Sequence, residues 1–153
     1  PLVAFGSAAG GGFAVADLTA AYKLDGVERA RRGVMLFDRR RRVLIQDEVT
    51  GTSALAPTWA MHTAAEVQAA GERATLTIEG TTLSARILSP AGAQFVAEPV
   101  KLEAPQKPTK GISKLSVKLA APATNLRITV LLAPGPDAGD APVRPLAEWQ
   151  AEA

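Results

Sequence analysis

Seven arginines fall within fourteen residues of the amino-terminal third, and their side chains are the best candidates for chemistry in this sequence. They are Arg29, Arg31, Arg32, Arg39, Arg40, Arg41 and Arg42. A guanidinium group is planar and permanently charged, and it binds carboxylates and sulfates through paired hydrogen bonds. The cluster predicts a polyanion-binding site, with Arg29 and Arg31 on one strand face and Arg39, Arg40, Arg41 and Arg42 at a basic turn.

Two other interpretations of the arginines remain open. Nucleic acid is attracted by the same charge, but Tyr22 and Phe37 are the only rings nearby, and we expect Phe37 to point into the core, so base stacking is poorly supported. Alternatively, the turn is a solvated basic hairpin that protects strand edges from aggregation or docks on an acidic neighbouring domain.

The sequence has one histidine, His62, which lies in a strand-like segment with Trp59. Alternation along a strand places His62 and Trp59 on opposite faces. One interpretation is a histidine that hydrogen-bonds to a neighbour within the fold. The other is a donor to an acidic sugar, from a neutral or charged imidazole. Without cysteine, a single histidine does not build a zinc site of ordinary ligand number.

The carboxylates and glycines offer no self-sufficient catalytic motif. Asp47 and Glu48 are sequence neighbours, so a strand points them to opposite faces and they do not share one substrate atom. The three glycines at 10–12 precede a strand rather than a helix, which is not the context of a phosphate-binding loop. Patterns typical of serine hydrolases, nucleotide-binding loops and zinc proteases are absent from the sequence.

The elements that must position these residues are predicted to be β-strands. Apolar residues recur mostly at every second position, in short runs bounded by Gly, Pro and Asp. The run at 43–45 predicts a buried strand, and we expect Gln46, Asp47 and Glu48 to mark its emergence into solvent. The remaining strands are expected at residues 2–5, 13–18, 27–37, 58–63, 74–79, 81–88, 94–98, 112–119 and 125–133. The fold class predicted is all-β, an antiparallel β-sandwich.

The connecting segments are also legible. Residues 38–42 form a hairpin turn, and Gly80 marks a second, tighter one. Residues 7–12 are expected to form a flexible, exposed loop, and residues 104–111 and 133–142 hold most of the remaining Pro and Gly. We interpret the short Ala-rich segment at 64–73 as loop or extended chain rather than helix.

Composition sets the limits of the molecule. The chain has 153 residues, 47% of them hydrophobic, which is enough for one core and predicts a single domain over residues 1–153. Its net charge is only +2, from 17 basic against 15 acidic residues, so the basicity is local. No cysteine is present, which excludes disulfides and thiolate metal sites. No apolar run reaches the roughly 18 residues of a membrane span, and no membrane partner is expected.

Several short motifs together resemble a known family. The first combines an Asp-Leu-Thr at 17–19 with Tyr22, and it is followed by an arginine-containing strand, a basic turn and a strand ending in Gln-Asp-Glu at 46–48. Later motifs are Trp59-x-x-His62-Thr63, an apolar strand at 126–133, and Pro-Leu-x-x-Trp at 145–149. This order resembles the C-terminal β-domain of heparinase II/III-like polysaccharide lyases, over nearly the whole chain.

The resemblance implies a function for a longer parent protein. Members of this family cleave uronic-acid polysaccharides by β-elimination, in which a base removes the C5 proton and an acid, often Tyr, protonates the leaving oxygen. These groups and any metal-ligating His and Asp lie mainly upstream, in an (α/α) toroid and an earlier part of the β-domain. No catalytic residue, metal ligand or cofactor is therefore expected in this chain, and Tyr22 matches only a structural pattern.

We expect a C-terminal fragment or processed piece of such a lyase, directed at alginate, heparan or another glycosaminoglycan. Its expected partners are an upstream toroid domain and an acidic polysaccharide, and the family resemblance implies a periplasmic or secreted protein. The proposed substrate contacts are the arginines of the strand and turn and His62. The alternative is a non-catalytic module that binds an acidic glycan or docks on another domain.

Overall fold

The computed structural model describes residues 1–22, 26–102, 105–106 and 110–151, and this part of the chain is built almost entirely of β-strands. The strands are β1 (Leu2–Ser7), β2 (Gly12–Asp17), β3 (Val27–Phe37), β4 (Arg42–Leu55), β5 (Trp59–Thr63), β6 (Glu66–Ala70), β7 (Arg73–Ile78), β8 (Thr81–Ser89), β9 (Gln94–Pro99), β10 (Ser113–Lys118) and β11 (Ala123–Pro134). Two short 3-10 helices accompany them, η1 (Thr19–Tyr22) and η2 (Leu146–Glu148).

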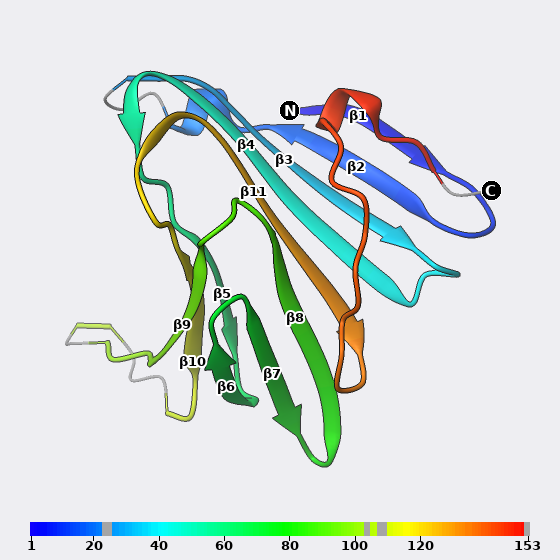
Figure 1. Ribbon diagram of the computed structural model, residues 1–153, viewed down its shortest axis with the longest axis vertical. Helices are drawn as coiled ribbons and strands as arrows, with labels where there is room; N and C mark the ends of the chain where they lie inside the picture. Colours follow the sequence, from blue (N-terminus) through cyan, green and yellow to red (C-terminus); the bar gives the residue numbers. More distant parts are fainter. Residues whose placement is uncertain (23–25, 103–104, 107–109, 152–153) are drawn as a thin grey trace.

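The strands form two antiparallel sheets of unequal size (Figure 1). The large sheet has eight strands in the order β1-β2-β3-β4-β11-β8-β7-β6, and the small sheet has three in the order β5-β10-β9. Every neighbouring pair is antiparallel, as short hairpin connections favour. The predicted all-β, antiparallel sandwich is confirmed.

Two hydrophobic cores lie on opposite faces of the large sheet. The first fills the space between the two sheets and includes Trp59, which packs edge-to-face on Phe95 with 6.4 Å between ring centroids. The second lies on the other face, where the C-terminal segment runs back over the sheet and places Leu146 and Trp149 against it (Figure 1). We call the face toward the small sheet the inner face and the face toward the C-terminal segment the outer face.

The strand β3 begins and ends at the predicted residues, whereas β4 differs from the prediction. It continues to Leu55, and Gln46 is completely buried rather than emerging into solvent. The amide of Gln46 is satisfied inside the protein, because Nε2 donates to the carbonyl of Arg144 and Oε1 accepts from the hydroxyl of Thr129. A buried amide with partners costs little, so the polar residue does not end the strand.

The predicted connections are correct in part. Residues 7–12, expected to be a flexible exposed loop, form a tight hairpin turn closed by a 2.8 Å bond from the Ala8 N–H to the Gly11 carbonyl. Gly11 is buried, and a Cβ at this position would meet the Leu36 carbonyl. The Gly80 hairpin is confirmed, and residues 64–73 are loop and extended chain rather than helix, because they hold β6 and the turn that joins it to β7. Much of the linker at 104–111 lies outside the described residues.

Candidate functional site: the arginine-rich hairpin

The β3–β4 hairpin holds its basic turn in an unusual backbone conformation. Asp38, Arg39 and Arg40 all have positive φ, at 52°, 54° and 63°. Residues other than glycine rarely adopt positive φ, so the turn needs support from its surroundings. That support comes from the Arg40 N–H, which donates to the Gly10 carbonyl, and the Arg41 N–H, which donates to the Phe37 carbonyl.

The four arginines of the turn fall into two groups. Arg40 donates to the Ala8 carbonyl at 3.0 Å, and Arg42 donates to the carbonyls of Ala138 and Asp140 at 2.8 and 2.6 Å. Arg42 also stacks over the Phe37 ring, 5.0 Å from its centroid. The two arginines with partners hold neighbouring segments in place and have less capacity left for a ligand.

Arg39 and Arg41 form the second group. Both are exposed, and no hydrogen bond or ion pair of either side chain occurs within the described parts of the chain. They lie on a turn that the hydrogen bonds of Arg40 and Arg42 hold in place. Their backbone positions are therefore fixed before any ligand binds. Two adjacent guanidinium groups in this arrangement can bind the carboxylates or sulfates of a polyanion.

The arginines of β3 lie far from the turn. Arg29 and Arg31 are in regular register and share one face of the sheet, as predicted. Eight residues separate Arg29 from Phe37, which corresponds to about 26 Å along a strand. The sequence cluster is therefore divided between two ends of the β3–β4 ribbon and does not form one site.

Two of the β3 arginines are occupied by carboxylates. Arg31 pairs with Asp17 at 3.2 Å, and Arg32 makes two bonds of 2.7 Å to the two oxygens of Asp47. The hydrogen bond from the Thr19 side chain, with the backbone N–H of Thr19 and then Arg31, lowers the pKa of Asp17 to about 2. The hydrogen bond to Asp47 raises the pKa of Arg32. Arg29 is exposed and remains available to a ligand.

His62 lies on the small sheet, away from the basic turn (Figure 1). Its neighbour on β10 is Lys114, whose ammonium group lies 3.3 Å from Glu98 of β9. His62 is exposed whereas Trp59 is buried, so the prediction that they occupy opposite faces is confirmed. The structure does not bring His62 together with any of the predicted arginine contacts.

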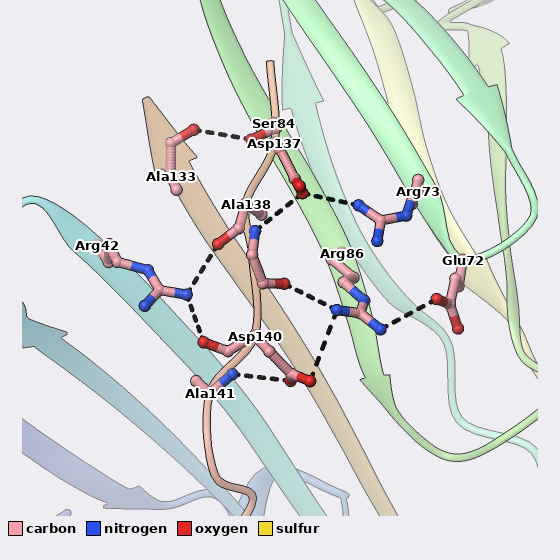
Figure 2. A network of polar contacts seen from close by, with 11 residues as sticks. Arg42, Glu72, Arg73, Ser84, Arg86, Ala133, Asp137, Ala138, Asp140 and Ala141 are labelled. Carbon is pink, nitrogen blue, oxygen red and sulfur yellow. Dashed lines mark hydrogen bonds and ion pairs between the residues drawn. The ribbon is translucent and has the colours of Figure 1, made fainter. Parts of the chain in front are cut away.

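A network that the sequence did not predict fixes the C-terminal segment to the outer face (Figure 2). Arg73 pairs with Asp137 at 2.8 Å, and Arg86 donates to the Gly139 carbonyl at 2.9 Å and pairs with Glu72 at 3.4 Å. The backbone N–H of Gly139, followed by Arg73, lowers the pKa of Asp137. With Arg42, these bonds hold residues 137–140 on three strands, which is an architectural role.

The described residues contain no cluster of side chains that could hold a metal ion. In residues 1–22, 26–102, 105–106 and 110–151, no group of three His, Asp or Glu side chains is positioned to hold a metal ion. Glu48 is engaged by the Arg127 side chain and by the Leu146 N–H, and it lies on the opposite face from Asp47. None of the helices in this part of the chain is long and apolar enough to cross a membrane.

Comparison with known proteins gives matches among solved structures alone, since no family model and no curated protein sequence matches. Heparan sulfate lyase HepC from Pedobacter heparinus superposes with a TM-score of 0.66 at 13% identity, over 92% of this chain and 22% of that one. A heparinase III gene product superposes with a TM-score of 0.64 at 18% identity, over 94% and 22%. A further heparinase III structure gives 0.61 at 13% identity, over 88% and 21%.

These values confirm the resemblance seen in the sequence at the level of the fold. The similarity extends over most of this chain, and the chain spans about a fifth of the length of the structures it matches. The fold described here is that of a β-sandwich portion of heparinase III-type polysaccharide lyases.

Proposed function

We propose that this chain is the C-terminal β-sandwich portion of a polysaccharide lyase that cleaves uronic-acid-containing polysaccharides by β-elimination. The observation that carries the proposal is the fold match to heparan sulfate lyase and heparinase III structures over 88–94% of this chain. The short motifs at 17–22, 43–48 and 145–149 support the same assignment, because they occur in the order expected for that β-domain.

The proposal places the catalytic groups elsewhere in a longer polypeptide. A general base and a general acid acting on one sugar unit must both come within hydrogen-bond reach, about 3 Å, of that unit. In this chain His62 belongs to β5 of the small sheet, and Tyr22 belongs to η1 beside the large sheet. The role proposed for residues 1–153 is to support a catalytic domain, and the proposed location is the periplasm or the outside of the cell, as expected for such enzymes.

The experiment that tests the proposal uses the complete gene-encoded polypeptide. We expect it to convert a uronic-acid polysaccharide, such as heparan sulfate, into unsaturated products that raise the ultraviolet absorbance. Residues 1–153 alone should give no rise at the same concentration. Absence of activity on heparan sulfate, other glycosaminoglycans and alginate would reject the lyase assignment, and activity of residues 1–153 alone would reject the supporting role.

A second candidate function is binding of an acidic glycan by the basic turn. Arg39 and Arg41 are exposed and have no side-chain partners among the described residues. They lie on a turn that the hydrogen bonds of Arg40 and Arg42 hold in place. This arrangement favours binding of a polyanion that passes over the end of the large sheet. The two functions are compatible, because a supporting domain can also hold a substrate chain.

A further inference from the structure

The outer face of the large sheet carries a group of arginines that lies away from the basic turn. The C-terminal segment covers this face as far as Gly33, where Leu146 and Trp149 pack, and its Leu146 N–H reaches Glu48. From that border onward, β3, β4 and β11 lie side by side and present two rows of polar side chains on the same face (Figure 1). These rows lie beyond the packing contacts of the C-terminal segment.

The strand register brings three arginines together in these rows, and we call them the outer arginine site: Arg29, Arg31 and Arg127. Arg31 lies in register with Glu48 of β4, and Glu48 lies in register with Arg127 of β11. Residues in register on neighbouring strands point to the same side of a sheet. The backbone positions of Arg31 and Arg127 are therefore two strand spacings, or about 10 Å, apart, and Arg29 lies about 7 Å from Arg31 along β3.

The ion pairs of Arg31 and Arg127 hold their guanidinium groups in a definite orientation. Arg31 contacts Asp17 through Nε at 3.2 Å, and Arg127 contacts Glu48 through Nε at 3.1 Å. Neither terminal nitrogen of these two arginines makes a hydrogen bond to any described residue. Arg32, on the inner face, instead binds its carboxylate through both Nε and Nη2. Arg31 and Arg127 thus each keep a pair of donors that can bind a carboxylate or sulfate through two parallel hydrogen bonds.

The arginines of the outer site lie nearer to solvent than the carboxylates that orient them. The side chains of Arg31 and Arg127 are 34% and 35% exposed, whereas those of Asp17 and Glu48 are 22% and 15% exposed. Glu48 also accepts a hydrogen bond from the Leu146 N–H, so part of its charge is directed into the protein. A ligand that approaches this face therefore meets the cationic partners first.

The second row adds neutral polar groups beside the arginines. It consists of Arg29, Thr50 and Asn125, whose side chains have no partner among the described residues. A hydroxyl and a side-chain amide can each donate to and accept from the hydroxyl groups of a sugar. Neither row contains an aromatic ring on which a nucleic acid base could stack. This combination of charged and neutral groups fits an acidic polysaccharide better than nucleic acid.

We propose that the outer arginine site binds an acidic polysaccharide independently of the basic turn, through paired hydrogen bonds from Arg31 and Arg127 to its carboxylates or sulfates. The choice of a polysaccharide among polyanions rests on the proposed function, whereas the anion-binding geometry does not. The two sites are separate, because Leu146 and Trp149 pack at Gly33, between Arg31 and the turn.

The test measures how a ligand protects individual arginines in the complete gene-encoded polypeptide. Each arginine is modified with phenylglyoxal, and its rate is followed by mass spectrometry with and without dextran sulfate. This ligand is sulfated but has no uronic acid, so a lyase of the proposed type does not cleave it. Neutral dextran and single-stranded DNA are the comparison ligands. Arg73, which is half-exposed and paired with Asp137, is the control arginine in the same samples.

At ten times the dissociation constant of dextran sulfate, we expect modification of Arg29, Arg31 and Arg127 to slow by about tenfold, because the occupied site is shielded. Arg73 should slow by less than about twofold. Unchanged rates at the three arginines, or equal protection of Arg73, would overturn the proposal. Equal protection by neutral dextran would also overturn it, and stronger protection by DNA would favour nucleic acid as the ligand.

A conservative substitution separates the paired donors from charge alone. Arg127→Lys keeps a cation beside Glu48 but removes the two terminal donors of the guanidinium group. The dextran sulfate concentration that half-protects Arg31 should rise by about fivefold or more. Arg73→Lys makes the same change in another ion pair and should leave that concentration unchanged. No effect of Arg127→Lys, or equal effects of both substitutions, would contradict the paired contact.

Arg29→Lys guards against a disturbed strand, because Arg29 is exposed and has no side-chain partner among the described residues. It should raise the same half-protecting concentration by about threefold, and no effect would remove Arg29 from the site. The lyase assay is scored separately on each sample. Protection without lyase activity would reject the proposed function and leave the site standing, whereas activity without protection would reject the site alone.

Discussion

The side-chain amide of Gln46 donates a 2.7 Å hydrogen bond to the backbone carbonyl of Arg144, 98 residues later in the chain. Gln46 is completely buried in the middle of the large sheet, and Arg144 belongs to the C-terminal segment. Next to this bond, the Leu146 N–H donates to Glu48 at 3.0 Å. Two polar residues of one strand therefore satisfy the backbone of an irregular segment and hold it against the outer core.

Replacing Gln46 should reduce the stability of the protein, because two buried partner groups lose their hydrogen bonds. Gln46→Leu removes the acceptor of the Thr129 hydroxyl and the donor to Arg144, and each buried group left unpaired costs about 1–3 kcal/mol. We expect the free energy of unfolding to fall by about 2–4 kcal/mol in urea titrations. Gln68→Leu, on exposed β6, is the matched control and should change it by less than about 0.5 kcal/mol. Equal effects of the two substitutions would show that Gln46 does not anchor the segment.

Gly33 tests the contact between the large sheet and the end of the chain. A Cβ at this position would lie 2.4 Å from a Leu146 side-chain carbon and 2.7 and 2.9 Å from Trp149 ring carbons. Gly33→Ala should therefore displace the segment, with a loss of about 1–3 kcal/mol and a red-shifted Trp149 emission. Trp59→Phe serves as the background in which Trp149 is the sole reporter.

The close contact between Gly33 and Leu146 can be tested with a double substitution. Leu146→Ala removes the nearest obstructing atoms, so the double substitution should be less destabilising than the sum of the two single ones. Simple additivity would mean that Gly33 and Leu146 do not meet in solution.

Asp17 predicts a specific dependence of stability on pH. Its pKa in the folded protein is about 2, below the ordinary value of 3.8, chiefly because the Thr19 side chain and backbone donate to it. A carboxylate with a depressed pKa stabilises the fold above its unfolded pKa, and this contribution is lost as the pH falls through the folded pKa. We expect the urea midpoint to drop between about pH 4 and pH 2 for this reason.

The comparison that isolates Asp17 uses Asp17→Asn. This variant should be less stable than the parent at pH 6, and the gap should be largely closed at pH 2, where about half of the Asp17 carboxylate is already protonated in the folded parent. Glu66→Gln removes an exposed carboxylate of β6. This variant should lose as much stability between pH 6 and pH 2 as the parent does. A constant gap between parent and Asp17→Asn at all pH values would contradict the assignment.

The sequence predicted the parts of the fold that depend on local pattern. Residues 27–37 were predicted as one strand that becomes continuously apolar at 34–37, and β3 has those bounds; the turn at 79–80 has the residues that a tight hairpin needs. The burial of Gln46 could not be predicted, because a polar residue after an apolar run ordinarily marks exposure. Two of its partners, Thr129 and Arg144, lie 83 and 98 residues away in the chain, so no local pattern reports them.

The sequence likewise predicted the position of the candidate site but not the contacts of its side chains. The basic turn was expected from composition and lies where expected, but the sequence does not tell which arginines are already engaged. Arg42 binds a segment 96 residues away in the chain. Arg73 and Arg86 are the only charged residues of their strands, so no cluster of charge marks them in the sequence. The two acidic residues at 137 and 140 were the available signal for this network, without an indication of which arginines they meet.

Binding of an acidic glycan should depend on Arg39 and Arg41, and the structure allows these to be tested without disturbing the fold. Arg39→Ser with Arg41→Ser removes two exposed charges that have no side-chain partner among the described residues, whereas Arg40 and Arg42, which hold neighbouring segments, stay in place. Losing two charge-assisted contacts should weaken binding to heparan sulfate by about tenfold or more at low salt. The control, Lys101→Ser with Lys118→Ser, makes the same change in net charge near or on the small sheet. If both double variants lose affinity equally, binding follows net charge and the basic turn is not a specific site; if neither loses affinity, the turn does not bind the glycan.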